Sequence, residues 1–102
     1  YIHVMDLAEG HISALKYLFG QKKKFINLNL GTGDGFSVLE LISTFSKVNN
    51  VKVPYEFTSK REGDVARLVA DNSLAVSLLN WHPKKKLDEM CLDGWNWRAS
   101  RK

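Results

Sequence analysis

The residues of this chain best suited to chemistry lie in one short turn, residues 60–65, with the sequence K-R-E-G-D-V. Arg61 offers a planar fork of N–H donors that suits a phosphate, whereas the Asp64 carboxylate only accepts hydrogen bonds and suits sugar hydroxyls. Gly63 permits a tight turn that would bring the two side chains together. The same residues also suit a solvated surface loop with a local ion pair. Taken alone, the turn favours this second interpretation.

A second candidate is the loop G-T-G-D-G at residues 31–35, which follows a strand-like run and precedes a helix-like one. Glycines in such a place can let backbone N–H groups approach a phosphate at a helix N-terminus. The spacing is not that of a dinucleotide-binding or Walker loop, and Asp34 would repel phosphate. The pattern therefore favours a structural turn.

Neither a metal site nor a nucleophilic site is predicted elsewhere. His3, His11 and His82 lack metal-ligand spacing with one another and with Cys91, so we expect structural or surface histidines. No Ser-His-Asp order with a nucleophile elbow is present. Cys91 is the single cysteine, which suits a reducing compartment such as the cytoplasm, and its place on a helix predicts a buried, inert thiol.

Composition limits the kinds of protein this can be. With 102 residues the chain forms one domain at most, with a modest core. Apolar runs are too short to span a membrane. The net charge of +4 sits partly in lysine clusters that no nucleic-acid-reading pattern accompanies, so we expect solvated loops and no nucleic-acid partner. The first residues include neither a signal peptide nor an initiator methionine, and we expect a piece of a longer protein.

Apolar spacing predicts four helices, over residues 6–19, 37–49, 74–79 and 87–99. Asp6, with Glu9 three residues on, is the expected N-cap of the first helix; Ser37 and Asn72 are the expected caps of the second and third. Residues 1–4, 25–30 and 51–57 are expected to be strands. The order predicts a mixed α/β layer structure.

Several segments together resemble UDP-glucose 4-epimerases, which are extended short-chain dehydrogenases/reductases. Residues 1–11 resemble the family's Y-I-H-V-x-D-L-A-x-G-H, and residues 29–40 resemble its N-L-G-T-G-x-G-x-S-V-L-E. Residues 61–66 match its R-E-G-D-V-A turn, and the closing L-x-W and last helix also fit. The ordered match covers essentially the whole chain and implies the C-terminal, substrate-binding part of such an enzyme, which would complete a Rossmann-type N-terminal domain.

The resemblance implies that UDP-glucose and UDP-galactose are interconverted through transient oxidation at C4 by a bound NAD. The family's NAD fingerprint and Tyr-x-x-x-Lys pair belong to its N-terminal portion. In this chain, Met5, Gln21 and Ser59 stand four residues after the three tyrosines. We therefore expect no catalytic residue and no NAD contact here, and an inactive chain when it is alone.

What the resemblance implies locally is substrate binding. Arg61 would contact the UDP diphosphate and Asp64 the uridine ribose hydroxyls. Val38 would lie along the uracil, Tyr1 matches a tyrosine of the substrate pocket, and Leu68 falls where the family varies a residue of the sugar pocket. The family's arginine two positions before that tyrosine would precede residue 1.

The resemblance also divides the chain by expected partner. Residues 1–35 would pack on or extend the sheet of the nucleotide-binding domain, and residues 36–102 would form the substrate-binding part. The whole enzyme would be a homodimer. Two alternatives stay open: another NAD-dependent nucleotide-sugar epimerase or dehydratase, and, outside the enzymes, a stand-alone basic binding module.

Overall fold

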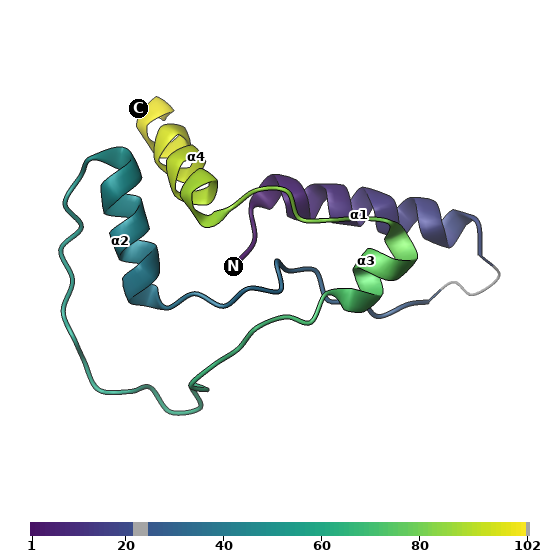
Figure 1. The fold of residues 1–102 in the computed structure, drawn as a ribbon, viewed down its shortest axis with the longest axis horizontal. Coiled ribbons are helices and arrows are strands. Elements are labelled where there is room, and N and C mark those ends of the chain that lie inside the picture. The colour runs from purple at the N-terminus through teal and green to yellow at the C-terminus, as the bar shows by residue number, and fades with distance from the viewer. Residues whose placement is uncertain (22–24, 102) are drawn as a thin grey trace.

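The structure, a computed structural model, describes residues 1–21 and 25–101. It contains four helices, labelled in Figure 1: α1 (Val4–Phe19), α2 (Val38–Asn49), α3 (Ser73–Leu79) and α4 (Leu87–Ser100). Every predicted helix is confirmed, with its ends shifted by two residues or fewer. None of the four helices is both long and apolar enough to cross a membrane.

The start of α1 differs from the prediction, because His3 and not Asp6 is its N-cap. The His3 Nδ1 accepts a hydrogen bond from the Met5 backbone N–H at 3.0 Å, which satisfies one of the free donors of the first turn. Asp6 lies one turn further in and is almost fully buried, at 2% exposure. Its carboxylate accepts hydrogen bonds from backbone N–H groups of the segment before α4.

The caps of α2 and α3 are each formed differently. Ser37 caps α2 as predicted, since its Oγ accepts from the Glu40 N–H at 3.0 Å. Asn72 occupies the N-cap position of α3, but its side chain donates to the Gly31 carbonyl oxygen at 2.7 Å instead of capping the helix. Asp71 serves the start of α3, accepting from the Ser73 N–H and hydroxyl at 3.0 and 2.7 Å.

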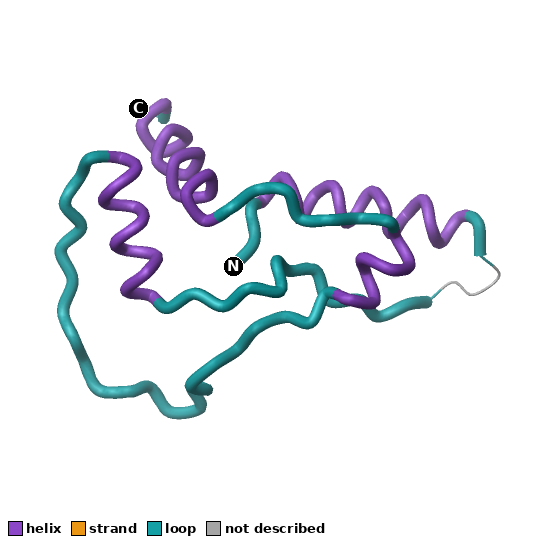
Figure 2. The backbone as a smooth tube through the Cα atoms, viewed as in Figure 1, coloured by secondary structure: helices purple, strands orange, loops and turns teal. Residues whose placement is uncertain are grey.

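The predicted strands are wrong for this chain on its own. Within the described residues 1–21 and 25–101 there is no strand, and residues 25–30 and 51–57 run as loops (Figure 2). A strand exists through the ladder it makes with a neighbour, and the described part of the chain provides no such neighbour. Residues 1–4 are not a strand either, since α1 already begins at Val4.

The helices associate in two pairs, α2 with α4 and α1 with α3. The Phe45 and Trp95 rings meet edge to face across the α2–α4 pair, with centroids 5.7 Å apart. The predicted burial of Cys91 is confirmed, at 3% exposure. The α1–α3 pair encloses a small core of Ala75, Leu79 and Trp81.

The molecule is open for its length. Its Cα radius of gyration is 16.7 Å, whereas a compact domain of about 100 residues has about 13 Å. In Figure 1 the segment between α2 and α3 runs far outside the helices. Along α1, Val4, Ile12, Leu15 and Phe19 are each more than half exposed although their spacing places them on one face. Much of the apolar surface therefore has no covering element within the described residues.

Candidate functional site

The turn at residues 61–64 has the geometry that its sequence predicts. The Asp64 N–H donates to the Arg61 carbonyl oxygen at 3.3 Å, closing a four-residue turn. Gly63 has φ +81°, a value that glycine adopts without a steric penalty at the third position of a type II turn. This turn brings the Arg61 Nε to 2.9 Å from the Asp64 Oδ2.

The ion pair leaves most of the hydrogen-bonding capacity of both side chains unused. Arg61 is 86% exposed and Asp64 is 41% exposed. Among the described residues, the Nε–Oδ2 bond is the only hydrogen bond to either side chain, so the two terminal nitrogens of Arg61 and the Asp64 Oδ1 face solvent. A planar fork held at one nitrogen still presents two donors to an anion.

Tyr1 and Val38 lie on other segments, whereas Leu68 lies in the same α2–α3 segment as the turn; the three are exposed, at 56%, 61% and 88%. Tyr1 precedes α1, Val38 is the first residue of α2, and Leu68 lies in the segment before α3. Only Arg61 and Asp64 among the five predicted site residues are joined by a direct contact.

The glycine loop at residues 31–35 lies against the segment that carries Leu68. A Cβ added to Gly31 would stand 2.7 Å from the Ala70 Cβ, and one added to Gly35 would stand 2.9 Å from the Val69 Cγ2. Glycine is needed at position 31 because the Ala70 Cβ is fixed to its own backbone and cannot move away, whereas at position 35 the near atom belongs to the Val69 side chain. This contact agrees with the structural turn that the sequence favours.

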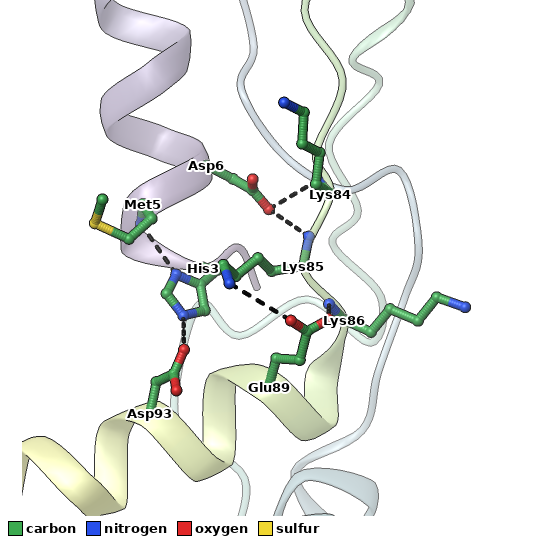
Figure 3. A network of polar contacts seen from close by, with 8 residues as sticks. All are labelled: His3, Met5, Asp6, Lys84, Lys85, Lys86, Glu89 and Asp93. Atoms are coloured by element: carbon green, nitrogen blue, oxygen red, sulfur yellow. Dashed lines mark hydrogen bonds and ion pairs between the residues drawn. The ribbon is translucent and has the colours of Figure 1, made fainter.

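The first turn of α1 is held by a network of polar contacts, drawn in Figure 3. The Asp6 Oδ2 accepts from the backbone N–H groups of Lys84 and Lys85 at 3.0 and 2.8 Å. The Trp81 Nε1 donates to the Asp6 carbonyl oxygen at 3.0 Å. The start of α1 is thereby fixed to the segment that connects α3 to α4.

His3 joins the same turn directly to α4. Its Nε2 lies 2.8 Å from the Asp93 Oδ2, across 90 positions of sequence. The predicted structural role of His3 is confirmed, since the side chain is buried and both ring nitrogens have partners. No spacing rule in the sequence indicates that these two residues meet.

A hollow of about 830 Å³ lies elsewhere, between the first turns of α2 and α4. Lys84, Lys85 and Lys86 line it together with Asp34, Glu40 and Asp88, so cations and anions balance there. None of the five predicted substrate residues lines it.

The buried thiol of Cys91 has the environment of an inert side chain. Burial raises the pKa of the Cys91 thiol, and the negative charge of Asp88 raises the pKa further. The thiolate is the reactive form, so both effects lower its reactivity. No group of three or more His, Cys, Asp or Glu side chains is arranged to hold a metal ion among the described residues.

Comparison with known proteins finds that the chain is similar to UDP-glucose 4-epimerases. The chain is 47% identical over 100 residues to the UDP-glucose 4-epimerase of Bacillus subtilis and 48% identical over 98 residues to that of Bos taurus. These matches cover 98% and 96% of this chain. No protein-family model matches.

Two solved structures share the fold. One is a UDP-glucose 4-epimerase from Stenotrophomonas maltophila with bound NAD and formylated UDP-arabinopyranose; it superposes with a TM-score of 0.93 at 46% identity over 98% of this chain. The other, from Bifidobacterium longum in complex with NAD+ and UDP, gives a TM-score of 0.88 at 37% identity.

The resemblance predicted from the sequence is thereby confirmed: over nearly its whole length, the chain is related to one part of the UDP-glucose 4-epimerases. It spans only 29% of the length of the Bacillus subtilis relative and 30% of the Stenotrophomonas structure, consistent with their C-terminal part. The helices and loops described above match the C-terminal part of a UDP-glucose 4-epimerase structure, which agrees with the predicted fold class.

Proposed function

We propose that this chain is the UDP-sugar-binding, C-terminal portion of a UDP-glucose 4-epimerase, an isomerase that interconverts UDP-glucose and UDP-galactose by transient NAD-dependent oxidation at C4. The observation that carries the proposal is the Arg61–Asp64 turn, which keeps free donors and free acceptors side by side. It occurs in a chain 46% identical to a structure that holds a UDP-sugar.

Arg61 would bind the diphosphate through its two terminal nitrogens, while Asp64 holds its Nε and so orients the fork. The unused Oδ1 of Asp64 would accept from the ribose hydroxyls. One carboxylate can do both because its two oxygens offer about four lone-pair directions.

Val38, Tyr1 and Leu68 would complete the site from their three segments. Val38 would lie along the uracil, Tyr1 would line the substrate pocket, and Leu68 would contact the sugar. Their exposure in this chain supports these roles, because each side chain is free to meet a ligand or another part of the protein.

NAD would be bound outside this chain. The close approach of Ala70 and Val69 to Gly31 and Gly35 supports this, because these side chains stand beside the glycine loop where a pyrophosphate would otherwise lie. The hydride chemistry would accordingly belong to residues outside this chain, and the chain alone would be inactive.

The uncovered apolar face of α1 and the loop conformation of residues 25–30 support the presence of a further domain that covers them. We propose that residues 1–35 pack on a Rossmann-type nucleotide-binding domain and that residues 36–102 form the substrate-binding part. Family resemblance alone supports a homodimer in the cytoplasm, acting in galactose metabolism.

The test is conversion of UDP-galactose to UDP-glucose by the natural-length protein that carries this chain, followed by chromatography. We expect an equilibrium mixture of the two sugars. Turnover of a different nucleotide sugar with none of UDP-galactose would favour the related epimerase or dehydratase, and no turnover or UDP binding at all would favour a stand-alone binding module.

A further inference from the structure

We propose that His3 and Asp93 are a positioning pair that fixes Tyr1 at the substrate site, an inference that rests on the binding role proposed above for Tyr1. Figure 3 shows the pair joining the N-terminal turn of α1 to the middle of α4. The Nε2–Oδ2 distance is 2.8 Å, and the His3 side chain is only 6% exposed. Asp93 is half exposed, so solvent reaches the carboxylate of the pair but hardly reaches the imidazole.

The two contacts of His3 determine how its ring is held. The Nδ1 accepts from the Met5 N–H at 3.0 Å and therefore carries no proton. The ring proton then lies on Nε2, which donates to the Asp93 carboxylate. One contact caps α1 and the other ties that cap to α4, so the ring cannot rotate without losing both.

Two contacts hold the backbone that follows Tyr1. The His3 carbonyl oxygen accepts from the Leu7 N–H at 3.0 Å, inside the first turn of α1. The Tyr1 carbonyl oxygen accepts from the Thr32 hydroxyl at 3.4 Å. The Tyr1 ring itself is 56% exposed, so its place depends on the backbone more than on packing of the ring.

Asp93→Ala would leave the cap of α1 intact but remove its direct bond to α4, while Asp6 still holds the first turn of α1 to the segment before α4. Tyr1 and Ile2, which precede the cap, would then lose this link to α4 and shift relative to it. A merely stabilising pair would instead lower the stability of the protein without acting through Tyr1, and a double-mutant cycle separates these two roles.

The experiment measures UDP-glucose affinity by calorimetry in the natural-length protein, for Asp93→Ala, Tyr1→Ala and the double variant. We expect Asp93→Ala to weaken binding about three- to tenfold and to add almost nothing once Tyr1 is alanine. Asp93→Asn should restore most of the affinity, because its amide oxygen can accept from Nε2–H. Asp88→Ala, an exposed acid on the same helix, is the matched control and should bind as the wild type does.

Equal losses from Asp93→Ala with and without the Tyr1 side chain would overturn the inference, as would unchanged affinity. If Asp93→Ala lowers the melting temperature too far for calorimetry, His3→Asn replaces it, because asparagine can cap α1 but is too short to reach Asp93. A wild-type protein that binds no UDP-glucose would contradict the proposed function itself, whereas normal binding with additive losses contradicts only the positioning pair.

Discussion

In the proposed site, Arg61 binds the diphosphate through its two terminal nitrogens while its Nε keeps the bond to Asp64. An exposed ion pair contributes about 0–1 kcal/mol, and this pair is exposed on the arginine side. A hydrogen bond to a charged group is worth about 1.5–3 kcal/mol. In the proposed site, the ligand bonds are therefore the stronger ones, and the ion pair would orient Arg61 without competing with binding.

Asp64→Asn should weaken the binding of uridine more than the binding of pyrophosphate. The substitution keeps one acceptor oxygen but removes the negative charge and half of the acceptor capacity for ribose hydroxyls. Calorimetry of the natural-length protein with the two ligands separately checks this, and equal losses for both would contradict the ribose role.

The hydrogen bonds of Asp71 predict how the stability of the fold changes at low pH. Hydrogen bonds from the Ser73 hydroxyl and then from the Ser73 N–H hold the pKa of Asp71 below its usual range. A carboxyl group whose pKa is lower in the folded state stabilises the fold above its unfolded pKa and loses this effect as pH falls through the folded pKa. The stability advantage of wild type over Asp71→Asn should therefore be constant above about pH 5 and shrink below about pH 4. Melting temperatures of both proteins from pH 2 to pH 7 test this, and a gap that does not change would contradict it.

Among the elements, the contact between the glycine loop and residues 69–70 sets where Leu68 lies. Gly31→Ala would place a methyl group against the Ala70 Cβ, which is fixed to its own backbone and cannot rotate away. We expect the variant to lose about 1–3 kcal/mol of unfolding free energy, the cost of overpacking. Denaturant unfolding of the natural-length protein measures it.

Gly94→Ala in α4 is the matched control, since nothing lies within 4 Å of the added methyl group. Its helix propensity should make it neutral or up to about 1 kcal/mol more stable. A Gly31→Ala protein as stable as the control would show that the two loops do not touch in solution.

The elements also show what local sequence can predict. Helices are encoded by apolar spacing and by caps such as Ser37, so they were predicted closely. Residues 51–57 have the alternation of a strand, but a ladder needs a partner that the described residues lack. Asp6 has the residue type of an N-cap and is instead used by Lys84 and Lys85, which lie far away in sequence. The same is true of the site, because the Arg61–Asp64 pair is local and predictable, whereas the His3–Asp93 pair joins residues 90 positions apart.

For the whole molecule, the small buried core limits what the chain can do alone. The buried apolar residues of the described part are Ala75, Leu79, Trp81, Leu87 and Cys91. Side chains this few cannot offset the conformational entropy of about 100 ordered residues. We expect the isolated 102-residue chain to unfold without a cooperative heat-absorption peak and to bind a hydrophobic dye such as ANS. A sharp calorimetric transition without dye binding would contradict this expectation.

The central claim is that this chain holds the UDP part of the substrate, and UDP calorimetry on Arg61→Ala in the natural-length protein tests it most directly. We expect a loss of about 1.5–3 kcal/mol of binding free energy, the worth of a hydrogen bond to a charged group. Lys60→Ala removes a neighbouring positive charge without the planar fork and should leave the affinity nearly unchanged. An Arg61→Ala protein that binds UDP as tightly as the wild type would contradict the account.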